Sequence, residues 1–545
     1  MIAVDVSFGT VWEAVAAHLP DEVAVSEPGR DLTYAEFDER AARLAAALEA
    51  AGVGPGDTVA CYLYNGAAYL ETVFAAFKIG AIPVNANYRY TGHELTELLT
   101  DADAAAVVFS GALGANVTHA ARHVRTLRLL VRVGPGDGPE APELEQLLAA
   151  TAPRPRTPRP GSDQLFMYTG GTTGKPKGVI WRQGDLMHSI TVAVFGPLGR
   201  TTLPATLDEA VEIAVAARTA GRAPVMMPVV PLMHGTGMFN TMGALMVGGR
   251  AVTARPGRLD PRHVWETVAA QRVSTIIVAG NAVAQPLVDE LRAAEEAGRP
   301  HDLSSLSNVI SSGTAFSDRL KRALHERAQV TVTDAIASSE GGPFAFAITR
   351  SVDDLPSRFM PVPATAVIGP GDRILEPGSD EVGVLGYRGP MPIGYYKDTD
   401  KTAATFRTVD GVRYAIPGDH AQITADGAIR FLGRRSGVIN TGGEKVHPQE
   451  VEDALLTHPD VADCAVVGVP DPTWGETVAA VVATPASPTE DELRRWVRRT
   501  LAGYKVPRRI VLVDHLPRTP TGKLEVARVR DIVEHATPAR PGRPA

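Results

Sequence analysis

The chain contains 545 residues, of which 44% are hydrophobic and 21% charged, so it can bury more than one large core and is not expected to be disordered. A net charge of −8 and a pI near 6.0 give no electrostatic footprint for nucleic acid, which leaves a small molecule as the expected partner. Cys61 and Cys464 are far apart, which argues against a disulfide framework or structural zinc site and makes a reducing cytoplasm the expected location. No integral membrane segment is expected, because no stretch reaches the roughly 18 uncharged apolar residues of a spanning helix.

Patterns typical of helices and strands alternate along the first part of the chain. Thr33 followed by Glu36 has the spacing of a capping box and predicts a helix that begins there. Strands are predicted at residues 57–63, 81–84 and 104–110, and helices at 67–77 and 94–99. This alternation predicts a layered α/β domain with a parallel sheet. Residues 135–160 are rich in Pro, Ala and Arg and predict a connector or an irregular segment.

Residues 167–178 read Met-Tyr-Thr-Gly-Gly-Thr-Thr-Gly-Lys-Pro-Lys-Gly and follow a strand-like run. Glycines bring successive N–H groups close to an anion, threonines add hydroxyl donors, and Lys175 and Lys177 supply positive charge. The order of Gly, Lys and Thr differs from the Walker pattern. An ordinary surface loop is the alternative, but the density of donors favours a loop that binds phosphate. Its candidate ligands are Thr169, Gly170, Gly171, Thr172, Thr173, Gly174 and Lys177.

The second half of the chain divides into regions of different pattern. Strand and helix patterns continue at residues 225–231, 264–271, 274–278 and 307–310. From about residue 365, short strand-like runs separated by turns predict a β subdomain. Small and charged residues at 433–437 predict a hinge, after which the pattern is that of a separate α+β unit. We therefore divide the chain into an N-terminal domain (1–433, with the β subdomain at about 365–433), a hinge (434–437) and a C-terminal domain (438–545).

The loop at 167–178 matches the phosphate-loop signature of the adenylate-forming enzymes, the superfamily of acyl-CoA synthetases, amino-acid-activating adenylation domains and luciferases. Four further stretches resemble elements of that superfamily in the same order: Asp334-Ala-Ile-Ala-Ser-Ser-Glu340, Pro417-Gly-Asp419, residues 433–446, and Pro517-Arg-Thr-Pro-Thr-Gly-Lys523. The chain is thereby identified as a member. The resemblance implies an α/β fold in which a large N-terminal domain of layered α/β subdomains plus a β subdomain carries a small, mobile α+β C-terminal domain.

The resemblance also implies roles for individual charged residues. Lys523 would bridge the oxygens of the carboxylate and the α-phosphate, and Glu340 would be a ligand of Mg²⁺. Asp419 would accept the ribose hydroxyls. Arg434 would contact ribose or phosphate in one state and serve as hinge in the other, and Ser436 stands where the family usually has Asp or Lys at the pivot.

Three further sets of residues follow from the resemblance. Gly313, Thr314, Asp334 and Ser339 would form the strip that receives adenine, with Ile336 and Ala337 in place of the family's aromatic residue and glycine. His234, Gly235 and Phe239 would line the acid pocket. Gly442, Gly443 and Lys445 would face coenzyme A in the second half-reaction.

Within the superfamily, residues 168–182, 394–403 and 440–446 resemble acyl-CoA synthetases of high-GC bacteria that activate fatty and steroid-side-chain carboxylates. This resemblance implies an AMP-forming acid–CoA ligase that uses ATP, Mg²⁺, coenzyme A and a small carboxylic acid. Three alternatives stay open: an acyl-AMP ligase that delivers to a carrier protein, a diazotase that activates nitrite and acts on an amine, and an inactive binding homologue. The oligomeric state is not readable from the sequence, and a homodimer is left open.

Overall fold

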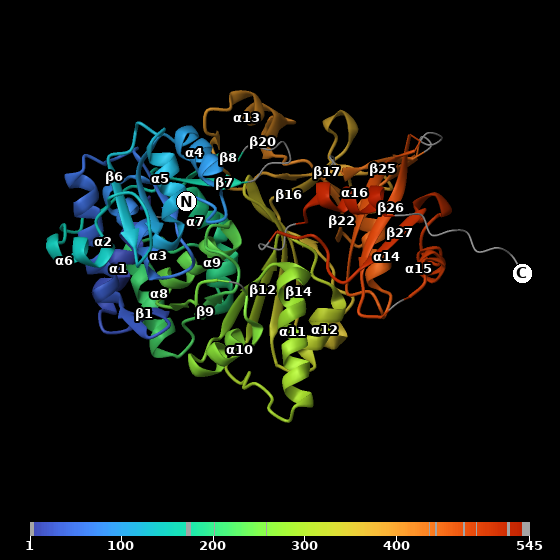
Figure 1. Ribbon diagram of the computed structural model, residues 1–545, viewed down its shortest axis with the longest axis horizontal. Helices are drawn as coiled ribbons and strands as arrows, with labels where there is room; N and C mark the ends of the chain where they lie inside the picture. The colour runs from blue at the N-terminus through green and yellow to red at the C-terminus, as the bar shows by residue number, and fades with distance from the viewer. Residues whose placement is uncertain are drawn as a thin grey trace, which may run out of the picture.

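Figure 1 shows the computed structural model, which describes residues 5–169, 176–200, 202–257, 259–434, 437–441, 444–471, 475–486, 488–519 and 524–536. The N-terminal third, in blue and cyan, lies at the left of the view, and the C-terminal part, in orange and red, lies at the right. The middle of the chain lies between them. Within the described residues, no helix is both long enough and apolar enough to span a membrane.

The first sheet forms where the alternating pattern predicts it. Its described strands are β3 (Thr58–Tyr62), β4 (Ile82–Asn85), β5 (Ala104–Ser110), β6 (Leu129–Val133), β7 (Gln164–Thr169), β8 (Lys177–Arg182) and β18 (Gly394–Tyr395). They lie in the order β18-β8-β7-β4-β3-β5-β6, and pairing is parallel from β7 to β6. The associated helices are α2 (Tyr34–Ala50), α3 (Ala67–Ile79), α4 (Gly92–Asp101) and α5 (Gly114–Ala121). Thr33 and Glu36 form the predicted capping box of α2.

The connector before the phosphate loop is not wholly irregular, because α6 (Leu144–Ala150) lies within residues 135–160. Glu143 accepts a hydrogen bond from the Gln146 N–H at the start of this helix, and Leu144 and Leu148 are buried. The prediction was therefore wrong for these residues. A short helix with one capping side chain and two apolar contacts leaves little signal in a Pro-rich and Ala-rich segment.

The second sheet is built from two separated stretches of chain. Its described strands are β1 (Val23–Glu27), β2 (Arg30–Thr33), β9 (Val225–Pro228), β10 (Arg250–Val252), β11 (Thr275–Val278), β12 (Asn308–Ser312), β13 (Thr331–Ser338), β14 (Gly341–Thr349) and β15 (Met360–Pro361). They lie in the order β15-β14-β13-β12-β11-β9-β10-β1-β2. One face is covered by α10 (Pro261–Ala270), α11 (Gly280–Glu296) and α12 (Asp318–His325), which share one apolar core with it. Helices α1 (Phe8–His18), α7 (Gln183–Phe195), α8 (Leu207–Thr219) and α9 (Gly235–Met246) complete this part.

The short strands predicted after residue 365 form an antiparallel sheet of their own. Its described strands are β16 (Thr365–Ile368), β17 (Gly383–Tyr387), β19 (Phe406–Val409), β20 (Val412–Ala415), β21 (Asp419–Ile423) and β22 (Ile429–Arg434). Helix α13 (Thr399–Thr405) lies between β18 and β19. Strand β18 instead pairs with β8, so this segment is attached to the first sheet.

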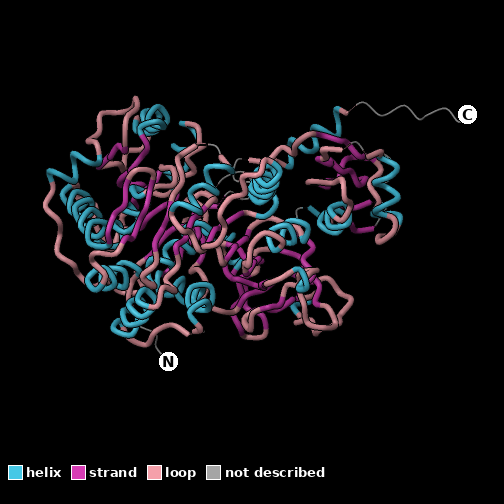
Figure 2. The backbone as a smooth tube through the Cα atoms, turned by 90° about the horizontal axis from the view of Figure 1, so that it is seen from below, coloured by secondary structure: helices cyan, strands magenta, loops and turns pink. Residues whose placement is uncertain are grey.

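The C-terminal strands make a separate sheet, which Figure 2 shows set apart at the right of the molecule. The described elements are β23 (Ile439–Thr441), β24 (Glu444–Val446), α14 (Pro448–Leu456), β25 (Asp463–Asp471), β26 (Gly475–Ala483), α15 (Glu490–Val497), β27 (Arg509–Val513) and α16 (Val526–His535). Apolar residues run almost without interruption along β25 and β26, because both faces of this sheet are covered. Helices α14 and α15 share a core with one face, and α16 shares a core with the other.

Candidate functional site

A cleft of about 2690 Å³ opens where the two large sheets, the β subdomain and the C-terminal part meet. Residues from every predicted part of the N-terminal site line it: Thr169, His234, Gly235, Phe239, Gly313, Thr314, Asp334, Ser339, Glu340 and Asp419. These residues are far apart in the sequence. The fold gathers most of them at or just beyond the carboxyl ends of strands β7, β12 and β13 or in the first turns of α9, whereas Asp334 lies within β13 and Asp419 begins β21.

Several predicted site residues cannot be placed in the same way. Gly170, Gly171, Thr172, Thr173, Gly174, Ser436, Gly442, Gly443 and Lys523 lie outside the described residues. The backbones of Arg434 and Lys445 are described, and Arg434 pairs with Asp419 across β21 and β22. The end of β22 therefore brings the backbone of Arg434 beside the buried Asp419.

Glu340 lies in the turn between β13 and β14 and is 8% exposed. The hydroxyl of Tyr395 donates a hydrogen bond to Glu340 Oε1 at 2.7 Å, and Trp181 Nε1 donates to the Ser339 carbonyl at 3.0 Å. Both partners come from the first sheet or its β18 extension, so the turn is held from across the cleft. A carboxylate oxygen is a suitable ligand for a hard cation, and a single carboxylate fits a Mg²⁺ ion that also binds substrate phosphates.

Asp334 lines the cleft but forms an internal ion pair. Lys321 Nζ lies 2.9 Å from Asp334 Oδ2 and also donates to Ser357 Oγ at 2.9 Å. Burial raises the pKa of Asp334, and the Lys321 ammonium acts in the opposite direction. The pair fixes β13 to α12 behind the predicted adenine strip. A direct contact between Asp334 and the nucleotide stays a prediction.

The segment after β12 packs closely against the start of α11. Gly313 has φ +90°, which favours glycine, and the buried hydroxyl of Thr314 has no partner among the described residues. Gly280 faces it, because a Cβ at this position would lie 2.3 Å from Thr314 Oγ1. Thr314 is thus accommodated by a glycine on α11 that the sequence did not single out.

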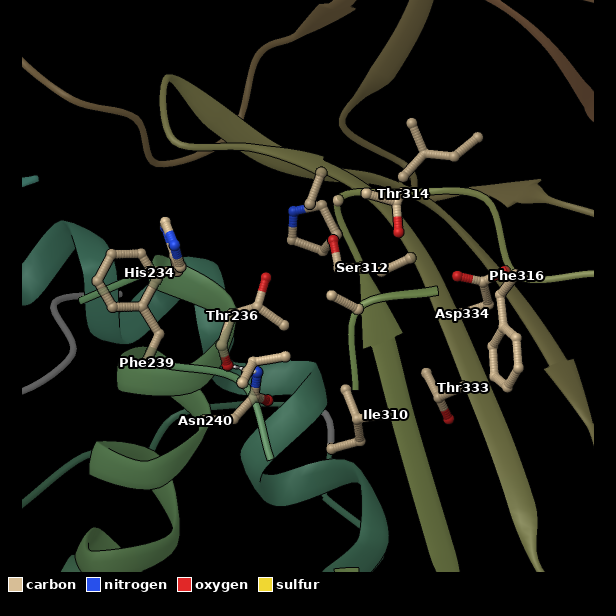
Figure 3. A pocket seen from close by; sticks show the side chains of 18 of the residues that line it. His234, Thr236, Phe239, Asn240, Ile310, Ser312, Thr314, Phe316, Thr333 and Asp334 are labelled. Atoms are coloured by element: carbon tan, nitrogen blue, oxygen red, sulfur yellow. Dashed lines mark hydrogen bonds between the residues drawn. The ribbon is translucent and has the colours of Figure 1, made fainter. Parts of the chain in front are cut away.

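The start of α9 brings the predicted acid-pocket residues together. His234 is the N-cap residue of this helix, and Gly235 begins it. A Cβ on Gly235 would lie 3.0 Å from the Phe239 ring, so the small residue lets the ring pack against the helix start. Figure 3 shows His234 and Phe239 on this helix, across an opening from Thr314 and Ser312 on the β12 side.

Comparison with known proteins agrees with this arrangement. The model of the AMP-binding enzyme family matches residues 12–396, and that of the AMP-binding enzyme C-terminal domain matches residues 450–523. The chain belongs to the AMP-binding enzyme family. The predicted membership of the adenylate-forming superfamily is confirmed.

Relatives of this AMP-binding enzyme match along nearly its whole length. It is 40% identical over 530 residues to a medium/long-chain-fatty-acid–CoA/3-oxocholest-4-en-26-oate–CoA ligase of Mycolicibacterium smegmatis, covering 95% of this chain and 94% of the relative. It is 38% identical over 526 residues to a 3-oxocholest-4-en-26-oate–CoA ligase of Rhodococcus rhodochrous, covering 94% and 93%. The crystal structure of an anthranilate CoA ligase with anthranoyl-AMP matches with a TM-score of 0.83 and 22% identity over 98% of both chains, which confirms the predicted α/β fold.

Asn85 of the AMP-binding enzyme is a site residue that the sequence did not single out. Its Nδ2 donates to the carbonyls of Tyr168 and Met233 at 2.9 and 2.7 Å, and its Oδ1 accepts from the Tyr168 N–H at 2.6 Å. One buried amide therefore joins the strand before the phosphate loop to the segment before His234. The available signal was its position at the end of a predicted parallel strand, where ligands commonly bind.

Asn65 makes a related link from the loop between β3 and α3. Its Nδ2 donates to the Val230 carbonyl at 3.0 Å, and its Oδ1 accepts from the Leu232 N–H at 2.7 Å. It also donates to the Pro228 carbonyl of β9 at 3.3 Å, so its side-chain hydrogen bonds within the described part of the chain reach β9 and the segment that leads to α9. The first sheet and the loop after β3 thus hold the segment before α9 through two asparagine side chains.

Lys177 of the AMP-binding enzyme leaves the phosphate loop at the start of β8, opposite Thr169. Its ammonium lies 3.0 Å from Asp398 Oδ2. A hydrogen bond from the Lys401 N–H, and then the contact with Lys177, lower the pKa of Asp398. A phosphate that recruits Lys177 must therefore compete with this carboxylate.

The C-terminal part also lines the cleft, through Gln449, Asp453, His458, Arg518 and Thr519. Arg518 forms two contacts with the Asp463 carboxylate, at 2.8 and 3.0 Å. Arg319 of α12 donates to the Ala462 carbonyl at 3.4 Å, which joins the two parts of the molecule. The segment that leads to Lys523 therefore begins at the wall of the cleft.

Proposed function

We propose that this AMP-binding enzyme is an AMP-forming acid–CoA ligase, which converts a carboxylate and ATP to acyl-AMP and pyrophosphate and then transfers the acyl group to coenzyme A. The observation that carries the proposal is the convergence of Thr169, Glu340, Asp419 and His234 on one cleft. The names of the relatives at about 40% identity support the same activity.

The first half-reaction requires negative charge to be held while the carboxylate attacks the α-phosphorus and pyrophosphate leaves. We assign the phosphates to Thr169, residues 170–174 and Lys177, and the ribose to Asp419 and Arg434. Glu340 would hold Mg²⁺, which when bound offsets charge on the phosphate oxygens. Lys523 would bridge the attacking carboxylate and the α-phosphate.

The second half-reaction needs the C-terminal domain to present a different surface. We propose the division into residues 1–433, a hinge at 434–437 and a mobile domain at 438–545, with Gly442, Gly443 and Lys445 facing coenzyme A. The separate sheet of β23–β27 supports a unit that moves as one body. His234 would line the junction between the acid pocket and the path of the thiol.

The acid that we propose is a medium-chain to long-chain fatty acid or a steroid-side-chain acid, the types in the names of the relatives. Apolar residues of α7 and α9 line the part of the cleft beyond His234, which supports a large apolar body. We further propose a cytoplasmic location and a homodimer as the assembly to test.

The experiment that tests the function is pyrophosphate release by purified protein with Mg-ATP and a panel of fatty, aromatic and steroid-side-chain acids, with and without coenzyme A. A thioester with one of these acids supports the proposal. Release only with nitrite and an aryl amine would assign a diazotase, and acyl-AMP that coenzyme A does not discharge would assign an acyl-AMP ligase. No release with any substrate would indicate an inactive homologue.

A further inference from the structure

One part of the cleft, here called the acid chamber, runs along the second sheet from Ser312 and Thr314 at one edge to Ser274 and Asn308 at the other. Strands β9, β11, β12 and β13 are parallel, so their carboxyl ends meet at one edge and their amino ends at the opposite edge. The cleft is lined at the carboxyl edge by Ser312 and Thr314 and at the amino edge by Ser274 and Asn308. From Asn308 to Ser312, strand β12 advances by four residues, so the two edges are about 13 Å apart.

The middle of this path is apolar. The residues that line it are Ile190 and Val194 of α7, Phe239 of α9, Val247 just after α9, and Ile310 of β12. Figure 3 shows Phe239 and Asn240 on one side of the opening and Ile310 and Thr333 on the other. The Asn240 amide donates to the Thr236 carbonyl at 2.8 Å, so one of its donors is used within its own helix. The walls between the two edges therefore suit an apolar body.

The amino edge is polar and offers hydrogen-bond donors. Arg222 is exposed there, and among the described residues no ion pair or side-chain hydrogen bond engages its guanidinium. Asn308 Nδ2 donates to Ser307 Oγ at 2.9 Å, and Ser307 Oγ donates to the Ser274 carbonyl at 3.1 Å. These contacts use one N–H of the Asn308 amide. Within the described part of the chain, the second N–H of Asn308 and the five donors of Arg222 have no protein acceptor, and both residues line the cleft.

We propose that Arg222, Ser274, Ser307 and Asn308 form a distal rim that binds a hydrogen-bond-accepting oxygen at the end of the acid opposite the activated carboxylate. The inference rests on the proposed function and names its substrate class: long apolar acids with a ketone or a second carboxylate at the far end. An unsubstituted alkyl end would displace water from these donors and leave them without a hydrogen-bond acceptor. An oxygen atom at the same place would accept hydrogen bonds from them.

The test compares saturated acids from dodecanoic to octadecanoic acid with the matching α,ω-dicarboxylic acids and with acids that end in a methyl ketone. The full chain is assayed with Mg-ATP and coenzyme A, and kcat/KM is measured from pyrophosphate release. We expect the best oxygenated acid to exceed its plain counterpart by about tenfold, which equals about 1.4 kcal/mol. A stronger preference for the dicarboxylic acid would identify an anionic end group, and a stronger preference for the ketone would identify a neutral carbonyl.

Arg222→Leu and Asn308→Ala should each lower the ratio of kcat/KM for the oxygenated acid to kcat/KM for the plain acid. The double variant should bring this ratio to about one while kcat/KM for the plain acids is kept. Arg299→Leu is the matched control, because Arg299 follows Gly298 after α11 as Arg222 follows Gly221 after α8 and does not line the cleft. Equal kcat/KM for plain and oxygenated acids in the parent, or a preference that survives the double variant, would overturn the inference. Absence of pyrophosphate with every acid would instead overturn the proposed function.

Discussion

Glu340 shows how one carboxylate is prepared for a ligand in the cleft. Tyr395 donates to one of its oxygens at 2.7 Å, and the ring of Tyr395 has the Lys401 ammonium 4.4 Å from its centroid. These contacts orient the carboxylate without forming an ion pair that would cancel its charge. Among the described residues, no group of three or more metal-ligating side chains occurs, so phosphate oxygens would have to complete the coordination of a bound cation.

Glu340→Gln keeps the shape of the side chain and an oxygen that accepts from Tyr395, but it removes the charge. We expect the rate of acyl-AMP formation to fall about 100-fold, which corresponds to about 2.7 kcal/mol of lost transition-state stabilisation. Pyrophosphate release measured over a range of Mg²⁺ concentrations checks this. Glu296→Gln on α11 is the control, and a Glu340→Gln enzyme with the parent's rate at every Mg²⁺ concentration would exclude the metal role.

Asn85 provides a second test, because its amide contacts the strand before the phosphate loop and the segment before His234. Asn85→Asp keeps an acceptor for the Tyr168 N–H but loses both donated hydrogen bonds. We expect it to weaken both nucleotide and acid affinity and to reduce the effect of one ligand on the other by about fivefold, a coupling of about 1 kcal/mol. Calorimetric titration of the acid with and without a non-hydrolysable ATP analogue measures this coupling.

Asn65→Asp is the matched control for that measurement. Asn65 contacts the segment before α9 and makes no contact with the phosphate-loop strand in the described residues. Its variant should weaken acid affinity while the coupling to nucleotide is kept. If both variants reduced the coupling equally, Asn85 would have only a general structural role.

At this scale the sequence identified residues that belong to contiguous motifs and missed those that act alone. Glu340 and His234 lie in stretches with several matching neighbours, and both line the cleft. Asn85 is a single polar residue whose partners lie far away in the chain, and nothing in its immediate sequence distinguishes it from a solvent-exposed residue. Tyr395 and Asp398 lie in the matched stretch 394–403, but their contacts with Glu340 and Lys177 depend on the fold and could not be read from that match.

Among the elements, α1, α2 and α3 share a buried ionic cluster. Lys78 of α3 lies 2.5 Å from Glu13 Oε1 of α1 and contacts Asp38 Oδ1 of α2, and all three side chains are nearly inaccessible. Arg156 also pairs with Asp38, at 2.6 Å. The three helices are thus joined by buried charges. The free-energy cost of removing each charge from water is offset only when all of its partners are present.

Lys78→Met should therefore lower the free energy of unfolding by about 3–5 kcal/mol, because two buried carboxylates lose their common partner. Urea unfolding of the full chain followed by tryptophan fluorescence checks this, since Trp12 lies 5.3 Å from Lys78 Nζ. Adding Glu13→Gln and Asp38→Asn should recover part of the loss. A single variant that unfolds at the parent's urea concentration would show that the cluster adds no stability.

The elements most readily predicted from sequence were the buried parallel strands. Strand β5 is buried along almost its whole length, so its sequence is a continuous apolar run with an evident type and position. Helix α6 was missed because its seven residues bury only Leu144 and Leu148. The attachment of β18 to β8 was missed for a different reason: two residues carry no periodicity, and the partner lies about two hundred residues earlier in the chain.

For the whole molecule, the C-terminal domain contains a half-buried titratable group, Glu452, next to Asp453, which lines the cleft. Glu452 of α14 accepts a hydrogen bond from the Val466 N–H of β25 at 2.8 Å. Burial is the main cause that raises the pKa of Glu452 to about 7. The hydrogen bond from the Val466 N–H and the charge of Arg518 lower this pKa, whereas the charges of Asp453 and Asp463 raise it. Arg518, one of the groups that act on the pKa of Glu452, also lines the cleft.

The direction of the pH dependence follows from this raised pKa. Between its ordinary pKa of 4.5 and about 7, the folded domain keeps a proton on Glu452 that the unfolded chain has released. The stabilising contribution is therefore full below about 4.5 and is lost as the pH rises through about 7. Glu452→Gln is uncharged at every pH, so it should remove this slope and stabilise the domain at neutral pH by on the order of 2 kcal/mol.

Amide hydrogen exchange of β25 and β26 measures this stability for the C-terminal domain alone, after correction for the intrinsic pH dependence of exchange. Glu296→Gln on α11 removes a carboxylate elsewhere and should leave the slope unchanged. If the slope persisted in Glu452→Gln, the proton would be held by a neighbouring carboxyl, and Asp453, whose pKa burial also raises, would be the next to replace. If protection rose with pH in the parent, the assignment of a neutral buried carboxyl to this domain would be wrong.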